Sequence, residues 1–362
     1  MSKALKALMT AAAALPGLAQ AATVADQVTL GVKYLDYFDY QKDRDRIKVR
    51  APMAWLNAPL DDKTELSGSV TYDSVSGASP WYLSTVSGAS GKGIDEQRRA
   101  MDAKLTRLFD KFSLGISGAV STEHDYLSRS VGIDARTDSE DRNTTYAAGF
   151  AVTADDIGSS NNPYLREART TRDYFVGITQ VLTPLAIVQS NLAFSEGVGY
   201  FSDPYKPLDN RPRERQQWAW LTRYRHYVPG LDAALHVDYR YFSNDWGIRA
   251  HTVDLAWYQA VGAGWSLRPS LRYYTQGAAD FFQPNFPPAS YGSIYSADQR
   301  LGAFGSLTTG IKAIKTLPGG YSFDVGFDFY RQKSSLKLGG GGSPGIDPLY
   351  AKIVYVGLSR SF

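Results

Sequence analysis

Apolar and polar residues alternate strictly along several long stretches of the chain. Over 321–330, aromatic or aliphatic residues occupy every odd position from Tyr321 to Phe329, and Ser, Asp or Gly occupies the even positions between them. The same division recurs over 64–72, 112–123 and 265–274. Alternation places the two sets on opposite faces of a strand. Strands of soluble sandwiches usually have about 5–6 residues, whereas a tilted strand needs about 9–11 to cross a bilayer. The pattern therefore predicts two-faced, membrane-spanning β-strands.

The connections between these strands alternate between tight and long. Short breaks rich in Pro, Gly, Asn or Asp occur at 58–63, 110–111, 139–143, 183–186, 229–232, 262–264 and 318–320. Longer polar stretches lie at roughly 38–45, 76–96, 157–168, 199–214, 277–297 and 333–346, with shorter ones near 123–127 and 243–247. Tight turns at one end and long loops at the other are typical of outer-membrane barrels. We therefore predict an all-β, transmembrane, antiparallel up-and-down barrel of about sixteen strands, with fourteen as the alternative. Its short turns would be periplasmic and its long loops extracellular.

Pro269 lies inside one of these predicted strands. Proline has no N–H to donate, and a closed barrel has no edge strand on which that loss is harmless. We therefore expect a bulge or another local irregularity at Pro269.

The N-terminus has the three parts of a secretory signal peptide. Lys3 and Lys6 precede an apolar stretch from Ala7 to Leu15, and Ala19-Gln20-Ala21 follows as a small-residue cleavage site. We expect residues 1–21 to be removed and 22–362 to form a single barrel domain. The alternative is an uncleaved amphipathic helix.

The C-terminus ends inside a predicted strand. Its outward face would carry Val354, Val356, Leu358 and Phe362. A terminal Phe preceded by alternating apolar residues looks like the insertion signal that the barrel assembly machinery of bacteria reads. Arg360 departs from that pattern, because an apolar or aromatic residue is usual two positions before the end. The alternative is an ordinary sheet edge.

Composition narrows the class of protein further. The 362 residues contain no Cys, so neither a disulfide framework nor a thiolate metal site is available. The formal net charge of +3 is too small to argue for nucleic acid. After the signal peptide there is no apolar run of about 18 residues, which excludes membrane-spanning helices. A mean hydropathy of -0.29 remains compatible with barrel strands, since these show only alternate residues to lipid.

Candidates for catalysis are few. His124, between Glu123 and Asp125, is the best candidate for a metal or acid-base site, although a solvated loop histidine is the favoured interpretation. His236 alternates with Asp238 and Arg240 on a predicted inner face, which favours a structural charge network. No G-x-S-x-G stretch indicates a nucleophile elbow. We expect no catalytic residues, metal or cofactor, and we regard the protein as not an enzyme.

The stretch 201–216 carries the densest charge. Six of its charged residues are candidates for binding: Asp203, Lys206, Asp209, Arg211, Arg213 and Arg215. Arginine forks suit phosphate and carboxylate groups, so the stretch could bind lipopolysaccharide phosphates, an anionic solute or a partner. The favoured alternative is a self-paired loop that packs on its neighbours or folds into the barrel mouth.

Several long segments resemble one bacterial family, catalogued as domain of unknown function 3570. They are "DRIKVRAPMAWL", "GSVTYDSVSGASP", "YFSDPYKPLDNRPRERQ", "NDWGIRAHT", "PSLRYYTQGAADF", "YSADQRLGAFGSLT" and "GSPGIDPLYAKIVYVGLSRSF". The resemblance covers nearly the whole mature chain and implies an outer-membrane-type barrel of uncharacterised activity, with no catalytic residues to carry over. It also implies an association with small lipoproteins and periplasmic redox or flavin-attachment proteins as partners.

Two functions fit these features in the outer membrane of a Gram-negative bacterium. The first is a water-filled pore for small solutes with weak charge selectivity. Its predicted lumen lining is Glu65, Asp238, Arg240, Asp254, Arg268, Arg272, Asp324 and Asp328, and we expect Arg268 and Arg272 to oppose Asp324 and Asp328. The second is an occluded barrel that acts as a scaffold for a lipoprotein or a periplasmic redox or flavin-linked partner. A barrel hydrolase is less favoured. Lipid and lipopolysaccharide are expected around either, and the oligomeric state is open.

Overall fold

The structure is a computed structural model that describes residues 24–42, 44–77, 94–206, 208–284 and 293–362. The predicted signal peptide at 1–21 and its cleavage site lie outside the described residues. So does most of the predicted loop at 76–96.

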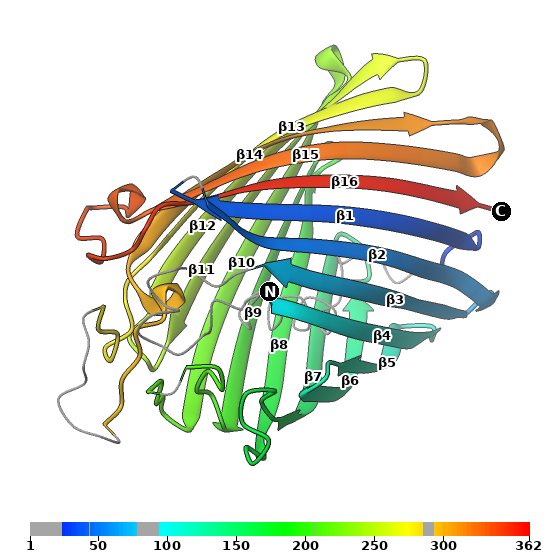
Figure 1. The fold of residues 1–362 in the computed structure, drawn as a ribbon. Helices are drawn as coiled ribbons and strands as arrows, with labels where there is room; N and C mark the ends of the chain where they lie inside the picture. The colour runs from blue at the N-terminus through cyan, green and yellow to red at the C-terminus, as the bar shows by residue number, and fades with distance from the viewer. Residues whose placement is uncertain (1–23, 43, 78–93, 207, 285–292) are drawn as a thin grey trace.

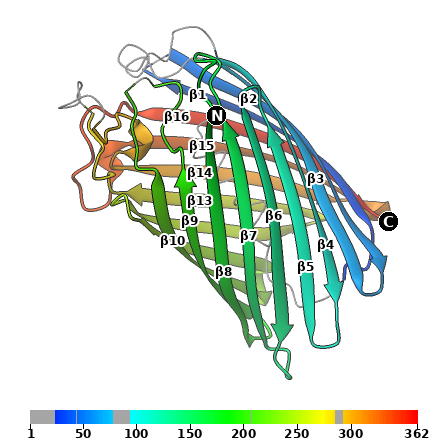
Figure 2. The same cartoon turned by 90° about the horizontal axis from the view of Figure 1, so that it is seen from below.

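Sixteen antiparallel strands in the described part of the chain form a closed barrel (Figures 1 and 2). Each strand pairs with its neighbour in sequence, and β1 closes the barrel against β16. The strands are β1 (Thr29–Gln41), β2 (Arg44–Asp61), β3 (Thr64–Gly77), β4 (Ile94–Leu108), β5 (Phe112–Thr122), β6 (Tyr126–Asp138), β7 (Thr144–Ile157), β8 (Glu167–Thr183), β9 (Ala186–Gly199), β10 (Glu214–Val228), β11 (Ala233–Asn244), β12 (Arg249–Gly262), β13 (Trp265–Gln276), β14 (Phe304–Thr316), β15 (Tyr321–Lys333) and β16 (Leu349–Ser361). The predicted all-β antiparallel barrel is confirmed, with sixteen strands and not fourteen.

Every predicted short break is a turn at one end of the barrel. Two of them contain 3-10 turns, η1 (Pro229–Leu231) and η3 (Pro318–Gly320). The turn between β12 and β13 consists of Gly262, Ala263 and Gly264, all with positive φ, of 84°, 51° and 74°. Glycine at two of these positions reduces the strain of a left-handed backbone. The C-terminus lies at the same end as these turns (Figure 1).

One predicted loop is not a loop. The polar stretch 38–45 was expected to be a long connection, but β1 continues to Gln41 and β2 begins at Arg44. Phe38 pairs with Lys48 on β2 and with Lys352 on β16, so the ladder runs through the polar stretch. The register shifts between Phe38 and Tyr40, which marks a bulge. The stretch resembles a loop in sequence because most of its residues are polar or charged, but the backbone pairing of the two strands continues through it.

The barrel is apolar outside and polar inside. Large apolar side chains are exposed on the outer wall, among them Val131 at 66% and Ile116 at 60%. The neighbouring positions on the same strands carry small or polar residues that face the interior. This reversal of the usual inside-outside rule is the pattern of a barrel whose outer wall contacts lipid. No helix among the described residues is long and apolar enough to cross a bilayer.

Pro269 disturbs pairing on one side only. The β12–β13 register runs from Ala256–Ser270 to Gln259–Leu267, and it skips the positions between without shifting. On its other side, Pro269 remains in register with Ile311. The expected irregularity is therefore a local gap in one ladder, and the expected bulge is not formed there. The missing N–H removes the bond, but the strands on both sides hold the register.

Candidate functional site

Charged side chains cross the inner wall in rows, because the antiparallel register aligns them on neighbouring strands. One row passes from Arg223 on β10 through Asp238 and Asp254 to Arg272 on β13. Arg223 Nε lies 3.7 Å from Asp238 Oδ2, and Arg272 Nε lies 3.5 Å from Asp254 Oδ1. Arg225, one row nearer the turns, also bonds Asp238. The row has two acids between two cations, and each acid lies beside a cation, so its charges neutralise one another.

The expected opposition of Arg268 and Arg272 to Asp324 and Asp328 is formed in part. Arg268 acts electrostatically on Asp328, whereas Arg272 and Asp324 have other ion-pair partners. Arg272 pairs with Asp254, as described above, and Asp324 Oδ2 lies 2.9 Å from Lys312 Nζ. The Arg268 guanidinium lies over the Tyr258 ring, 5.3 Å from its centroid. Strand order explains the difference, because β14 stands between β13 and β15 and its Lys312 reaches Asp324 first.

The remaining lumen candidates are placed as follows. Arg240 on β11 lies over the Phe242 ring, 5.6 Å from its centroid. Glu65 stands apart on β3, where its Oε2 accepts a hydrogen bond of 2.8 Å from the Ala25 backbone N–H. The candidates on strands β11 to β15 therefore lie on one part of the inner wall. Glu65 lies elsewhere and binds the backbone of the segment that leads into β1.

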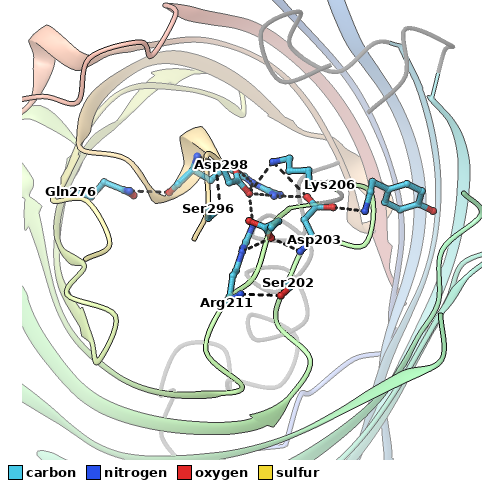
Figure 3. Close-up of polar contacts among 10 residues, drawn as sticks. Ser202, Asp203, Lys206, Arg211, Gln276, Ser296 and Asp298 are labelled. Carbon is cyan, nitrogen blue, oxygen red and sulfur yellow. Dashed lines mark hydrogen bonds and ion pairs between the residues drawn. The ribbon is translucent and has the colours of Figure 1, made fainter. Parts of the chain in front are cut away.

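Two long connections meet across the barrel mouth at the loop end. One is 200–213, between β9 and β10, and the other is 277–303, between β13 and β14. Asn210 and Tyr295 exchange backbone hydrogen bonds of 2.9 and 2.8 Å. In the view along the barrel in Figure 3, the labelled residues of both connections lie inside the ring of strands. These segments fold inward and narrow the mouth.

Six charged residues join the two connections, and we call them the mouth cluster. They are Asp203, Lys206, Asp209, Arg211, Asp298 and Arg300. Asp298 is its centre and is only 1% exposed. Its carboxylate lies 3.2 Å from Lys206 Nζ and 2.8 Å from Arg211 Nη2, and it accepts a bond of 2.7 Å from Arg300 Nε (Figure 3). Three cations therefore surround one buried carboxylate.

The acids on the 200–213 side complete the mouth cluster. Asp203 Oδ2 lies 3.0 Å from Arg300 Nη2, and Asp209 Oδ2 lies 2.8 Å from Arg211 Nε. Asp209 also accepts a bond of 2.5 Å from the Asp203 backbone N–H. Arg300 follows Asp298 in the short turn η2 (Gln299–Leu301), and the Asp298 side chain caps that turn by accepting from the Arg300 N–H at 3.1 Å.

Electrostatics favours the ionised forms of Asp298 and Arg211. Burial of Asp298 would raise its pKa, but Arg300, Lys206 and Arg211 hold the pKa well below the ordinary 3.8. Burial likewise would lower the pKa of Arg211, yet Asp209 and Asp298 raise it above its usual value. A buried ion pair is costly to break from one side, by about 3–5 kcal/mol, because the remaining charge loses its partner.

An apolar core packs beside the mouth cluster. It consists of Phe201, Trp246, Ile248, Ala279 and Leu301, from three different connections and their flanks. The Phe201 and Trp246 rings meet edge to face at 5.6 Å. The Arg215 guanidinium lies 4.9 Å from the Phe201 centroid and 5.3 Å from that of Trp246. The connections are therefore held together by apolar packing as well as by charge.

The six loop residues proposed from the sequence fall into two groups. Asp203, Lys206, Asp209 and Arg211 belong to the mouth cluster and are bonded within the protein. Arg213 is outside it, 61% exposed and 2.6 Å from Glu167 Oε2, and Arg215 stacks on the aromatic core. The structure therefore has the form of the favoured alternative, a self-paired loop folded into the mouth.

Sequence reasoning missed Asp298 and Arg300. The available signal was local, because the Asp of "SADQR" is a residue type that can cap a short turn. Nothing in the sequence placed it against 200–213.

His124 is exposed and is not brought to other acid-base groups. Its neighbour Asp125 instead bonds the Tyr205 hydroxyl and accepts a bond of 3.1 Å from the Ser160 N–H. Within the described ranges, no group of three or more His, Asp or Glu side chains is arranged to hold a metal ion.

Of the proposed assembly residues, Val354, Val356 and Leu358 lie on β16, and Phe362 directly follows it. Val354, Leu358 and Phe362 are exposed on the outer wall. Leu358 is in register with Val32 on β1 and with Phe323 on β15, so the final strand completes an apolar surface as it closes the barrel.

Comparison with known proteins identifies the family and the fold. CdiB from Acinetobacter baumannii has a similar structure, with a TM-score of 0.57 and 10% identity over 93% of this chain and 60% of that one. A bacterial polysaccharide outer membrane secretin has a TM-score of 0.52 and 8% identity over 94% of this chain and 99% of that one. At such identities the likeness shows the barrel fold alone.

The sequence comparisons are more specific. No curated protein matches the chain. One family model matches residues 5–91, 84–167 and 158–351, which together span most of the chain. It agrees with the family indicated by the sequence segments. The chain belongs to the family described as Protein of unknown function (DUF3570).

Proposed function

We propose that the chain is an outer-membrane pore that passes small solutes with weak charge selectivity. The observation that carries this proposal is a closed barrel of sixteen strands whose inner wall carries charged and hydroxyl side chains. Barrels of about 16–18 strands enclose more volume than their side chains fill and leave an aqueous channel. A polar lining is what a hydrated path requires.

The outer membrane is the proposed location because three features agree. The outer wall is apolar, the short turns and long loops lie at opposite ends, and the last strand ends in Phe362. Export would use the signal peptide at 1–21. Catalysis is left out of the proposal, since the best acid-base candidate, His124, is exposed and no group of side chains suited to a metal ion occurs among the described residues.

Weak selectivity follows from the charge balance of the inner wall. The acids Asp238, Asp254 and Asp324 each have a cationic partner on a neighbouring strand. Arg240 and Arg268 add positive charge, and Asp328 adds negative charge on the same wall. Because most of these charges lie beside a charge of opposite sign, an ion passing the wall meets only a small net potential.

The mouth cluster favours a second function, an occluded scaffold. A loop region with its own apolar core and a buried ionic centre resists displacement more than a mobile surface loop does. In that case, the barrel would serve a lipoprotein or a periplasmic redox or flavin-linked partner. No contact in the structure identifies such a partner.

Conductance separates the two functions. The purified barrel should give discrete openings in planar bilayers. A matched variant can shorten the loop at its base, because the Arg211 backbone N–H already bonds Ser202 Oγ at 3.0 Å and the two ends are close. Replacing 203–210 by two glycines should enlarge the openings. Openings only in the shortened protein would favour the occluded scaffold, and silence from both would refute the pore.

A further inference from the structure

A basic and aromatic patch covers the outer wall at the loop end of β15, β16, β1 and β2, four strands that lie side by side (Figure 1). Its cations are Lys48, Arg50, Arg331, Lys333 and Lys352, and its rings are Phe38, Tyr40, Phe329 and Tyr350. Register places them together, since Lys352 pairs with Phe38 and Phe329, and Tyr350 pairs with Tyr40 and Arg331. We call these nine residues the outer-wall patch.

The cations and rings of the outer-wall patch contact one another. Tyr40 stacks on Phe38 at 5.8 Å and on Tyr350 at 5.4 Å between centroids. Lys48 Nζ lies 5.1 Å from the Phe38 centroid, Lys333 Nζ 5.8 Å from that of Tyr350 and Lys352 Nζ 6.0 Å from that of Tyr40. The rings hold the ammonium groups over the wall while their remaining hydrogens face outward.

Charge in the outer-wall patch is not balanced. Arg50 lies 3.7 Å from Asp36, and Lys48 lies 3.6 Å from Asp45. Arg331, Lys333 and Lys352 have no ion-pair partner within 4.0 Å among the described residues.

In the sector of the outer wall formed by β6 to β9, two outward cations have acidic partners. Arg129 pairs with Asp156 at 2.8 Å, and Arg172 with Glu196 at 3.1 Å. The excess of positive charge thus marks the β15–β2 sector and sets it apart from the β6–β9 sector.

The depth of the outer-wall patch fits a lipid headgroup. On β15 the outward residues are apolar from Tyr321 to Phe329, a stretch close to the 9–11 residues that cross the hydrocarbon. Arg331 and Lys333 follow directly. On β16 the outward residues Leu358, Val356 and Val354 lead in the same way to Lys352. The cations therefore begin where the apolar band ends, at the level where aromatic side chains and headgroups meet.

We infer that the outer-wall patch binds the phosphate groups of lipopolysaccharide in the outer leaflet. The inference rests on the proposed outer-membrane placement with the long loops outside, but not on conduction. Phosphates require clustered donors and positive charge, which the Lys and Arg groups supply. The acyl chains beneath would lie on the apolar residues that adjoin the patch, such as Val354, which is 42% exposed.

The test uses the full barrel in detergent, with lipid binding measured by native mass spectrometry. The probe is bisphosphorylated lipid A, compared with the same lipid after removal of its phosphates and with inorganic phosphate. The variant Arg331→Gln, Lys333→Gln, Lys352→Gln removes the unpaired cations. The control Arg129→Gln, Arg172→Gln changes cations at the same end of the wall outside the patch. Heat modifiability on gels reports folding of each protein.

We expect wild type and the control to retain lipid A, and the triple variant to bind it at least ~10-fold more weakly, since each cation near a charged lipid surface adds to the attraction. Dephosphorylated lipid A should bind weakly to all three. Equal retention of both lipids by wild type, or equal losses in variant and control, would overturn the inference. Displacement of lipid A by millimolar inorganic phosphate would show a site for free phosphate and would also overturn it. Should the triple variant not fold, the wild-type comparison of the two lipids decides.

Discussion

The Arg360 guanidinium lies over the ring of Phe362, 4.4 Å from its centroid, and also over Tyr321 on the neighbouring strand, at 4.8 Å. Arg360 was the one departure of the last strand from the pattern of an assembly signal. In the barrel it lies between two rings at the turn end, a depth where a charged head reaches water while its stem lies along apolar surface. An arginine is therefore accommodated at this position, and it orients the terminal ring.

We predict that removal of Phe362 lowers the amount of assembled barrel far more than the amount of protein synthesised. The deletion removes the recognition residue and the backbone bond of 2.9 Å from the Phe362 N–H to Val28. Heat-modifiable protein in the outer membrane is the measurement. Arg360→Leu serves as the control and should assemble normally. Unchanged folded barrel after the deletion would show that the terminus is an ordinary sheet edge.

The topology predicts opposite accessibility at the two ends of the barrel. The chain has no Cys, so single cysteines can be labelled without background. Tyr164→Cys, at a position 91% exposed between β7 and β8, should react with an impermeant maleimide on intact cells. Thr183→Cys, at the end of β8 beside the turn to β9, should react only after lysis. An epitope within 88–93, outside the described residues, should also be exposed. Labelling of both cysteines on intact cells would contradict this orientation.

Neutralising the centre of the mouth cluster should open the mouth. Asp298→Asn leaves Lys206, Arg211 and Arg300 close together without the carboxylate that joins them, at an expected cost of about 3 kcal/mol in loop docking. Single-channel conductance should rise, and trypsin should cleave faster within 200–213. Asp156→Asn, on the exposed outer wall, is the matched control and should change neither quantity. A silent Asp298→Asn barrel with an unchanged cleavage rate would mean that the apolar core alone holds the loops.

The low pKa of Asp298 gives a pH prediction with a definite sign. Despite burial, Arg300, Lys206 and Arg211 depress the pKa well below 3.8, so the stabilisation is present above the ordinary carboxyl range. The stabilisation is lost only as the pH falls through the depressed pKa of Asp298. Conductance recorded from pH 7 down to pH 3 should stay constant through the range of ordinary carboxyl titration, about pH 4–5. An increase within that range would show that another acid controls the mouth.

Charge substitutions on the inner wall should shift ion preference in opposite directions. Arg240→Gln with Arg268→Gln removes two lumen cations and should move the reversal potential under a salt gradient towards cation preference. Asp324→Asn with Asp328→Asn should move it towards anions. The change expected is a few-fold in the permeability ratio, because the remaining wall is balanced. Arg129→Gln on the outer wall should have no effect. If both double substitutions on the inner wall leave the reversal potential unchanged, ions do not pass along this wall.

Much of the architecture was predictable because it depends on a local rule. A strand that contacts lipid on one face and water on the other must alternate, and Tyr321 to Phe329 shows this without reference to any other strand. Turn residues are equally local, and each short break became a turn. The error at 38–45 arose where the rule is weakest, since outward positions beyond the hydrocarbon tolerate charge and a strand there resembles a loop in sequence.

The sequence by itself determined the fold class, the ends of most strands and which residues share a face. The tertiary structure decided which residues contact one another. Lys312 takes Asp324 because β14 lies between β13 and β15, and Asp298 reaches Arg211 across 87 positions of chain because two loops fold over one mouth. The outer-wall patch likewise joins β1 and β2 to β15 and β16 only because the barrel closes. Alternation of apolar and polar residues can be read from the sequence of one strand. These contacts depend on strand order, register and barrel closure, which no single segment of the sequence specifies.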